Sequence, residues 1–301
     1  MEDYLQRGET VEPVVVEQIE AMMRARGIEL YERILEGSRD VRRIFDRVLD
    51  DLAELRVEIN SGVAEAASIP WELMRDPASD SPIALRAQAF VRVQSNPNID
   101  FVRAPRAKEG RIRLLYVAAR PDGADDVALR AVANRLLQDL GGDRERFEIS
   151  ALRTPTFEQL QRTLADAKAA GRPFHIVHFD GHGVYEDLNK TRWADWLRAI
   201  NALTLGGHAK GKHGYLMFEH QERELRPVSG EELGRLLRDN GVPVLALNAC
   251  QSAMHQAAER PAAAADAHDA VRAIGSLAQA VIDQGIPAVL GMRYSVYVVT
   301  A

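Results

Sequence analysis

Three short, mostly apolar stretches constrain the fold of this 301-residue chain more than any other feature. They are Ile112–Ala119, Phe174–Phe179 and Val242–Leu247, and each has the length of a single β-strand. A strand that is apolar at most positions is expected in the centre of a parallel sheet, where helices cover both faces. Helical patterns such as Val127–Leu140 stand between these stretches. The sequence therefore predicts an α/β fold with a parallel or mixed central sheet.

Several predicted helices have clear start and stop signals. Thr156 with Gln159, and Ser229 with Glu232, have the spacing of capping boxes in front of apolar helical repeats. A later helix is expected to end at Gly285, because glycine readily adopts the left-handed conformation that closes a helix.

The first 50 residues have a different pattern. Val11–Leu52 shows helical periodicity in two parts, with Gly27 as the expected end of the first helix and Ser38 as the N-cap of the second. Leu55–Ile59 then alternates with period two, which is typical of a strand with one buried face. We therefore predict an N-terminal helical segment over residues 1–53 that packs on a main domain over residues 54–301.

The overall composition excludes several classes of protein. No apolar run approaches the roughly 18 to 20 residues that a membrane span needs, and the polar start does not resemble a secretory signal. The single cysteine cannot form an internal disulfide, which favours a reducing, cytoplasmic location. The net charge of -6 argues against nucleic acid as the main partner. One local basic run, from Arg103 to Arg113, is interpreted as solvated.

Two of the apolar stretches lead into segments with chemically active side chains. Phe174–Phe179 is followed by residues 180–183 (DGHG), where two glycines are expected to turn the backbone and leave His182 at the rim of the sheet. Val242–Leu247 is followed by residues 248–252 (NACQS), which include Cys250. If the two strands are neighbours, a thiol and an imidazole meet at one edge, as nucleophilic catalysis by cysteine requires.

Each residue also has a plain structural interpretation. Cys250 could be a small buried apolar residue, and His182 could simply cap a turn. A metal site is not expected, because the spacing of His178 and His182 suits metal ligands on a helix and not at a strand end. No cofactor motif is present: no glycine-rich nucleotide fingerprint follows Ala119, so a nucleotide-binding domain is the weaker alternative.

Four motifs in the same order resemble the CHAT domain family, which comprises caspase-like and separase-like cysteine peptidases. They are residues 69–74 (IPWELM), 177–183 (VHFDGHG), 247–252 (LNACQS) and 285–291 (GIPAVLG). The resemblance implies a caspase-like three-layer α/β/α sandwich. It also implies that His182 is the general base, that Cys250 is the nucleophile, and that the backbone amides of Gly183 and Cys250 hold the oxyanion.

The resemblance further implies partners. The substrate is expected to be a protein. A sensor that follows residue 301 is expected to activate the enzyme, and the preferred candidate is a sensor of cyclic oligonucleotides in a prokaryotic antiviral pathway. Asp180, Asn248 and Gln251 are candidates for orienting the imidazole or shaping the substrate pocket. An acidic pocket could also come from Glu186, Asp187 or Asp283. The alternative function is that of a catalytically inactive scaffold that binds other proteins.

Overall fold

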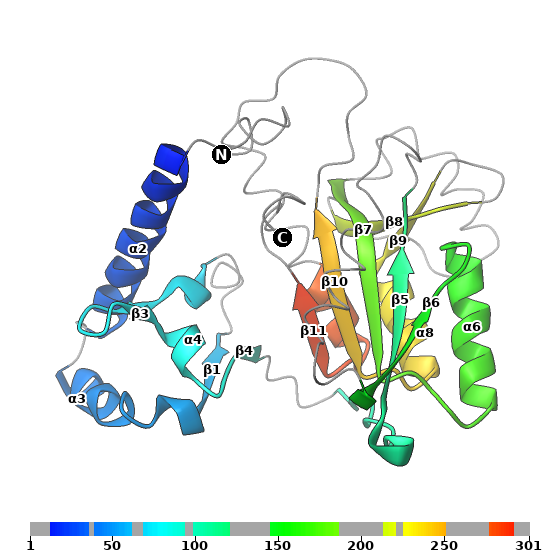
Figure 1. Ribbon diagram of the computed structural model, residues 1–301, viewed down its shortest axis with the longest axis horizontal. Coiled ribbons are helices and arrows are strands. Elements are labelled where there is room, and N and C mark those ends of the chain that lie inside the picture. Colours follow the sequence, from blue (N-terminus) through cyan, green and yellow to red (C-terminus); the bar gives the residue numbers. More distant parts are fainter. Residues whose placement is uncertain are drawn as a thin grey trace. The chain divides into compact units, whose positions relative to one another are not determined.

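The computed structural model describes residues 13–35, 39–61, 69–93, 99–120, 145–186, 213–220, 225–250 and 277–291. The chain forms two compact units, Met1–Pro97 and Asn98–Ala301, which are described here one at a time (Figure 1). The first unit extends beyond the boundary that the sequence suggested at residue 53. The expected packing of residues 1–53 on the main domain stays a prediction.

The first unit combines helices with two small sheets. Its elements are α2 (Pro13–Leu35), α3 (Arg39–Val48), η1 (Leu52–Glu54), β1 (Arg56–Asn60), η3 (Trp71–Leu73), β2 (Arg75–Asp76), β3 (Ser81–Pro82), α4 (Ile83–Arg86) and β4 (Ala89–Val93). β1 pairs with β4 in parallel, and β2 pairs with β3 in antiparallel orientation. The buried centre of this unit consists of Tyr31, Leu35, Leu52, Met74 and Ile83.

Helix α2 runs straight through Gly27, so the prediction that this glycine ends the helix is wrong. A β-carbon on Gly27 would lie 2.1 Å from the carbonyl oxygen of Leu73, well inside any allowed contact. The glycine is therefore explained by the close packing of α2 against the segment that contains η3. A local pattern cannot distinguish this role from a helix stop, because both call for the same residue.

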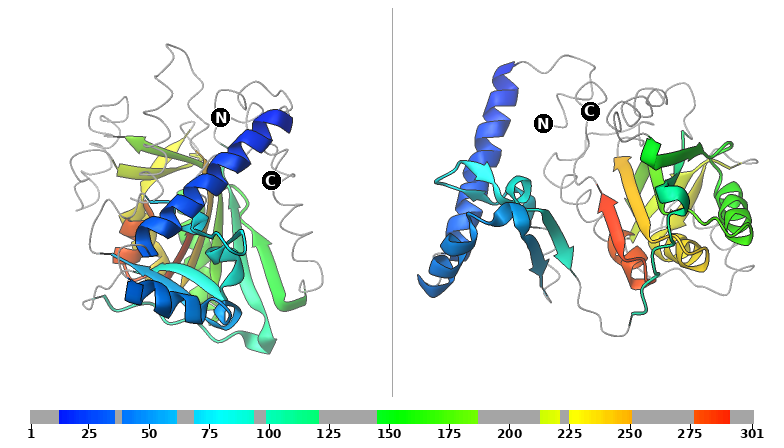
Figure 2. Two further views of the ribbon diagram at one scale, coloured as in Figure 1. Left: turned by 90° about the vertical axis from the view of Figure 1, so that its left-hand side faces the viewer. Right: turned by 60° about the horizontal axis from the view of Figure 1, so that its bottom comes forward.

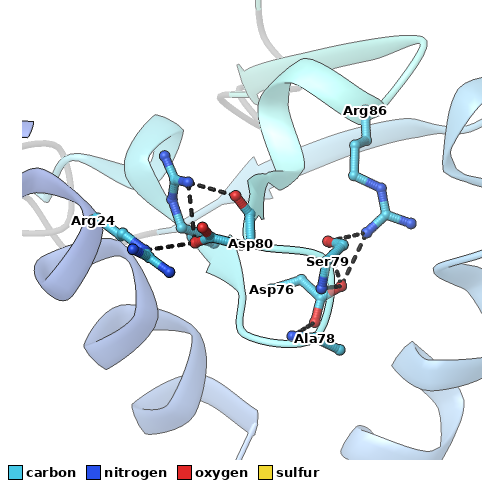
Figure 3. Close-up of polar contacts among 7 residues, drawn as sticks. Arg24, Asp76, Ala78, Ser79, Asp80 and Arg86 are labelled. Atoms are coloured by element: carbon cyan, nitrogen blue, oxygen red, sulfur yellow. Dashed lines mark hydrogen bonds and ion pairs between the residues drawn. The ribbon is translucent and has the colours of Figure 1, made fainter. Parts of the chain in front are cut away.

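A buried carboxylate organises the turn between β2 and β3 (Figure 3). Asp76 is 5% exposed and accepts hydrogen bonds from the backbone amides of Ala78 and Ser79, at 3.0 and 3.3 Å. The Ser79 hydroxyl and the Arg86 guanidinium donate to it at 2.7 and 3.0 Å. Burial alone raises the pKa of Asp76, but these donors outweigh it, and the pKa is lowered.

The second unit is built around one sheet. Its elements are η4 (Lys108–Gly110), β5 (Ile112–Ala118), β6 (Phe147–Ala151), α6 (Phe157–Ala169), β7 (Ile176–Glu186), β8 (His213–Phe218), β9 (Arg226–Ser229), α8 (Gly230–Asp239), β10 (Val244–Cys250), a helix over 277–283, and β11 (Ala288–Gly291). In the described part of the chain this sheet has seven strands.

Five of these strands, in the order β11-β10-β7-β5-β6, are all parallel and lie side by side in Figure 1. β8 pairs in antiparallel orientation with the second half of β7, and β9 pairs with β8 in the same way. The sheet is thus mostly parallel and is flanked by helices. The prediction of a caspase-like α/β fold is confirmed.

One face of this sheet packs against α6, α8 and the helix over 277–283. Figure 2 shows α6 and α8 beside the strands. The packed residues alternate along the strands, as period two requires: Leu115 and Val117 on β5, Val177 and Phe179 on β7, and Leu245 and Leu247 on β10.

The two predicted caps are confirmed. The Thr156 hydroxyl accepts from the Gln159 amide at 3.2 Å, and the Ser229 hydroxyl accepts from the Glu232 amide at 3.1 Å. Gly285 follows the helix over 277–283 with φ of 93°. The helix predicted over 127–140 lies outside the described residues. None of the described helices is both long and apolar enough to cross a membrane.

The glycines of the DGHG segment do not form the sharp turn that the sequence suggested. β7 continues as a strand through residues 180–183 to Glu186, and neither Gly181 nor Gly183 has a positive φ. Likewise, β10 continues through Cys250 and does not end at Leu247. Both segments stay extended because β7 and β10 keep pairing up to His182 and Cys250, and β7 then pairs with β8 as far as Glu186.

Candidate functional site

β7 and β10 are neighbours in the sheet and run parallel, so their carboxyl ends lie at the same edge. Their register pairs Asn248 with Asp180 and Cys250 with His182. Cys250 is the last residue of β10. The two residues with the chemistry of a nucleophile and a base therefore occupy one row of the sheet, at its carboxyl edge.

The row that contains His182 is also where β7 changes partner on its other side. Up to Asp180, β7 is paired with β5, whose last partner is Ala118. From His182 onward it is paired with β8, beginning with Met217. His182 thus has Cys250 on one neighbouring strand and Met217 on the other, and the histidine is only 5% exposed.

Asp180 is the centre of a buried polar network just below this row. It is 3% exposed, and its Oδ1 accepts from the side-chain amide of Asn248 at 3.0 Å. Its Oδ2 accepts from the Tyr116 hydroxyl at 2.5 Å and from the Arg120 guanidinium at 2.7 Å. Burial, followed by the hydrogen bond to this carboxylate, raises the pKa of Tyr116. Both carboxylate oxygens of Asp180 accept hydrogen bonds, and Arg120 forms an ion pair with it. Asp180 therefore does not offer a free carboxylate to a basic side chain of a substrate.

Arg120 connects this network to the end of β5. Besides the Asp180 carboxylate, its guanidinium donates to the carbonyl oxygens of Ala119 and Asp180, at 3.0 and 2.9 Å. Its backbone amide donates to the Glu219 carboxylate at 3.0 Å. Arg120 was not among the residues predicted from the sequence. The signal in the sequence that could have indicated its role is a basic residue directly after a central apolar strand.

His178 lies one row further from the edge, in register with Tyr116 on β5 and Ala246 on β10. Its ring packs against that of Tyr116 with centroids 5.4 Å apart. Burial lowers the pKa of His178, an effect that the charge of Asp180 partly offsets. Its Nε2 is buried and has no hydrogen-bond partner in the described structure. These features suit a neutral imidazole that is packed in the sheet.

The other candidates are less informative. Gly183 follows His182 in β7, opposite Leu216 of β8. Gln251 and Asp187 lie outside the described residues, as does the side chain of Glu186. Asp283 is exposed and accepts a hydrogen bond from Gln279 at 2.8 Å.

Asp283 ends the helix that leads into the start of β11, where Ala288 pairs with Val244. It therefore precedes the amino ends of the strands, at the edge opposite to Cys250. Within the ranges that the structure describes, no three His, Cys, Asp or Glu side chains are grouped so that they could hold a metal ion.

A comparison with protein-family models matches residues 39–301 to the family described as CHAT domain. Comparisons with curated proteins and with solved structures gave no significant match. The matched range covers most of the chain and includes the strands that carry His182 and Cys250. The chain therefore belongs to the CHAT domain family of caspase-like cysteine peptidases.

Proposed function

We propose that this chain is a cysteine endopeptidase in which Cys250 is the nucleophile and His182 is the general base. The observation that carries this proposal is the register of β7 and β10, in which these two residues are partners. Residues paired in a parallel ladder have their side chains on the same face of the sheet. The pairing therefore supports a thiol and an imidazole that can exchange a proton.

The reaction proceeds through a thioester. His182 takes the proton of the Cys250 thiol, and the thiolate sulfur forms a bond to the carbonyl carbon of the substrate peptide. The amine product leaves with the proton that His182 returns, and water then hydrolyses the thioester to release the acid. The backbone amides of Gly183 and Cys250 are the proposed donors to the oxyanion.

We further propose that a regulatory partner or a fused sensor opens the site. With His182 only 5% exposed, a peptide needs a rearrangement at this edge before it can reach the base. Such burial supports a resting form. The identity of the sensor, and with it the expected role in antiviral defence, stays a prediction.

The proposal is tested by labelling the protein with a peptidyl electrophile. Cys250 is the only cysteine of the chain, so any thiol adduct reports on this residue alone. We expect the activated wild-type protein to be labelled and the activated His182→Ala variant to be labelled much more slowly, because the base is gone. Cys250→Ala in the activated full-length protein should cleave no peptide in a lysate, measured by sequencing the new amino termini.

His175→Ala is the matched control. His175 precedes β7 by one residue, and seven residues along a strand separate it from His182 by about 23 Å. It should be labelled like the wild type. The competing function, that of an inactive scaffold, predicts equal labelling of the wild type and His182→Ala. Cleavage by Cys250→Ala would refute the proposed nucleophile.

A further inference from the structure

The Asp180 network joins three strands two residues before Cys250 and His182. We define the side chains of Tyr116, Arg120, Asp180 and Asn248 as the Asp180 clamp. Tyr116 and Arg120 connect β7 to β5 and to its end, whereas Asn248 is the arm that connects β7 to β10. The clamp therefore spans the strands of both proposed catalytic residues.

The position of the clamp gives it a specific task. The Asp180 row is the last one in which β7 is flanked by parallel strands on both sides, since β5 contributes no partner beyond Ala118. His182 and Cys250 follow two residues later, which is about 6.6 Å along the strands. Only the pairing with β10 on one side and with β8 on the other remains there.

The hydrogen bond between Asn248 and Asp180 is expected to hold the two strands rigidly together. The carboxylate accepts from a neutral amide across the two strands, while Arg120 supplies the opposite charge. A buried carboxylate with every oxygen engaged is held in one orientation, because rotation would leave donors unsatisfied. Strands joined in this way keep a fixed spacing at their ends.

We propose that Asn248 and Asp180 are positioning residues that set the separation of the Cys250 thiol and the His182 imidazole. The inference rests on the proposed function. Asn248 acts through Asp180 and the two strands, and we assign it no contact with the substrate. Geometry of this kind matters, because a displacement of about 1 Å between reacting groups can cost about 100-fold in rate.

The test is the rate at which iodoacetamide alkylates Cys250 at neutral pH in the full chain. We expect Asn248→Ala to slow this reaction by between about 10-fold and 100-fold. Asn240→Ala is the control, since Asn240 is also buried, at 8% exposure, and also donates one side-chain hydrogen bond, to the Leu236 carbonyl at 2.8 Å. It lies before β10, at the opposite end from Cys250.

Asn240→Ala should lose comparable stability but alkylate within about twofold of the wild type, as expected for a distant, independent site. A merely structural role for Asn248 predicts the same small effect for both variants, and that result would overturn the proposal. Failure of the proposed function looks different: the wild type and His182→Ala would then be alkylated at equal rates.

A swapped pair covers the case in which Asn248→Ala does not fold. Asp180→Asn combined with Asn248→Asp exchanges the amide and the carboxylate between the two strands and retains a bond between them. We expect this double variant to recover most of the alkylation rate. A folded double variant that reacts as slowly as His182→Ala would overturn the positioning role.

Discussion

Gly181 of β7 lies directly against the end of β5, so that a β-carbon on it would be 3.0 Å from the carbonyl oxygen of Ala119. Such a carbon would also be 2.9 Å from two atoms of the Phe179 ring, which is itself 1% exposed. Neither the backbone carbonyl nor a ring in the packed core can move away freely. We therefore expect Gly181→Ala to lower the free energy of unfolding by about 1 to 3 kcal/mol, measured by urea denaturation.

Gly183→Ala provides the comparison within the same motif. The nearest described atoms to a β-carbon on Gly183 are the Tyr215 carbonyl oxygen and the Ala249 β-carbon, at 3.6 and 3.7 Å, which are ordinary contacts. Its free energy of unfolding should stay within about 0.5 kcal/mol of the wild type. Equal destabilisation of the two variants would contradict the proposed reason for Gly181.

The second prediction concerns the buried carboxylate of the first unit. Asp76→Asn replaces a carboxylate, which accepts on two oxygens, with an amide that has one acceptor oxygen. It also leaves Arg86 without its ion-pair partner. We expect a loss of about 2 kcal/mol in the free energy of unfolding at pH 7, measured in urea. Because the pKa of Asp76 is lowered in the folded protein, its contribution is present above about pH 4 and is lost as pH falls further.

Asp80→Asn is the matched control for Asp76. The Asp80 side chain is 44% exposed and pairs with Arg24 (Figure 3) and with Arg75. Asparagine tolerates the positive φ of 51° at this residue. The cost should stay below about 1 kcal/mol, as for other exposed ion pairs. If Asp76→Asn kept the same deficit at pH 3 as at pH 7, ionisation would not explain the effect.

The third prediction uses the partly buried imidazole of His178. In His178→Phe the new ring can keep the contact with Tyr116, while the unsatisfied Nε2 is removed. We expect a gain of about 1 kcal/mol in the free energy of unfolding at pH 7. The expected change in pH dependence is equally specific.

Because burial lowers the pKa of His178, the folded protein keeps this residue neutral while the unfolded chain takes up a proton below about pH 6.5. The wild type therefore loses stability as pH falls from 7 toward 5, and the variant should lose less. His175, whose pKa burial also lowers, accounts for part of the remaining slope. Denaturation curves at pH 5, 6 and 7 measure both effects; identical slopes would contradict this account.

Much of the second unit could be predicted from the sequence because its signals are local. Short apolar stretches located the strands that became β5, β7 and β10, and hydroxyl side chains identified the starts of α6 and α8. The short strand β9 was not predicted. It contains Pro227, which is unfavourable inside a sheet but tolerated on an edge strand, and among the described strands β9 pairs with β8 alone.

Residues whose role depends on contacts between distant segments were not predictable in this way. Gly27 and Gly181 were interpreted as a helix stop and a turn, but both are required by a carbonyl oxygen 46 or 62 residues away in the chain. The Asp180 clamp is a similar case. Its hydrogen bonds join Asp180 to Tyr116, 64 residues earlier, and to Asn248, 68 residues later, and no spacing in the sequence reveals them.

The change of partner along β7 makes the site mechanically asymmetric. His182 belongs to the segment of β7 that pairs with β8 at five consecutive residues. Cys250 lies on β10, which has no pairing with β8 among the described residues. β8 and β9 are therefore attached to the sheet through the strand that carries His182. A partner that binds β8 and β9 would thus act on the strand of the base before it acts on the strand of the nucleophile.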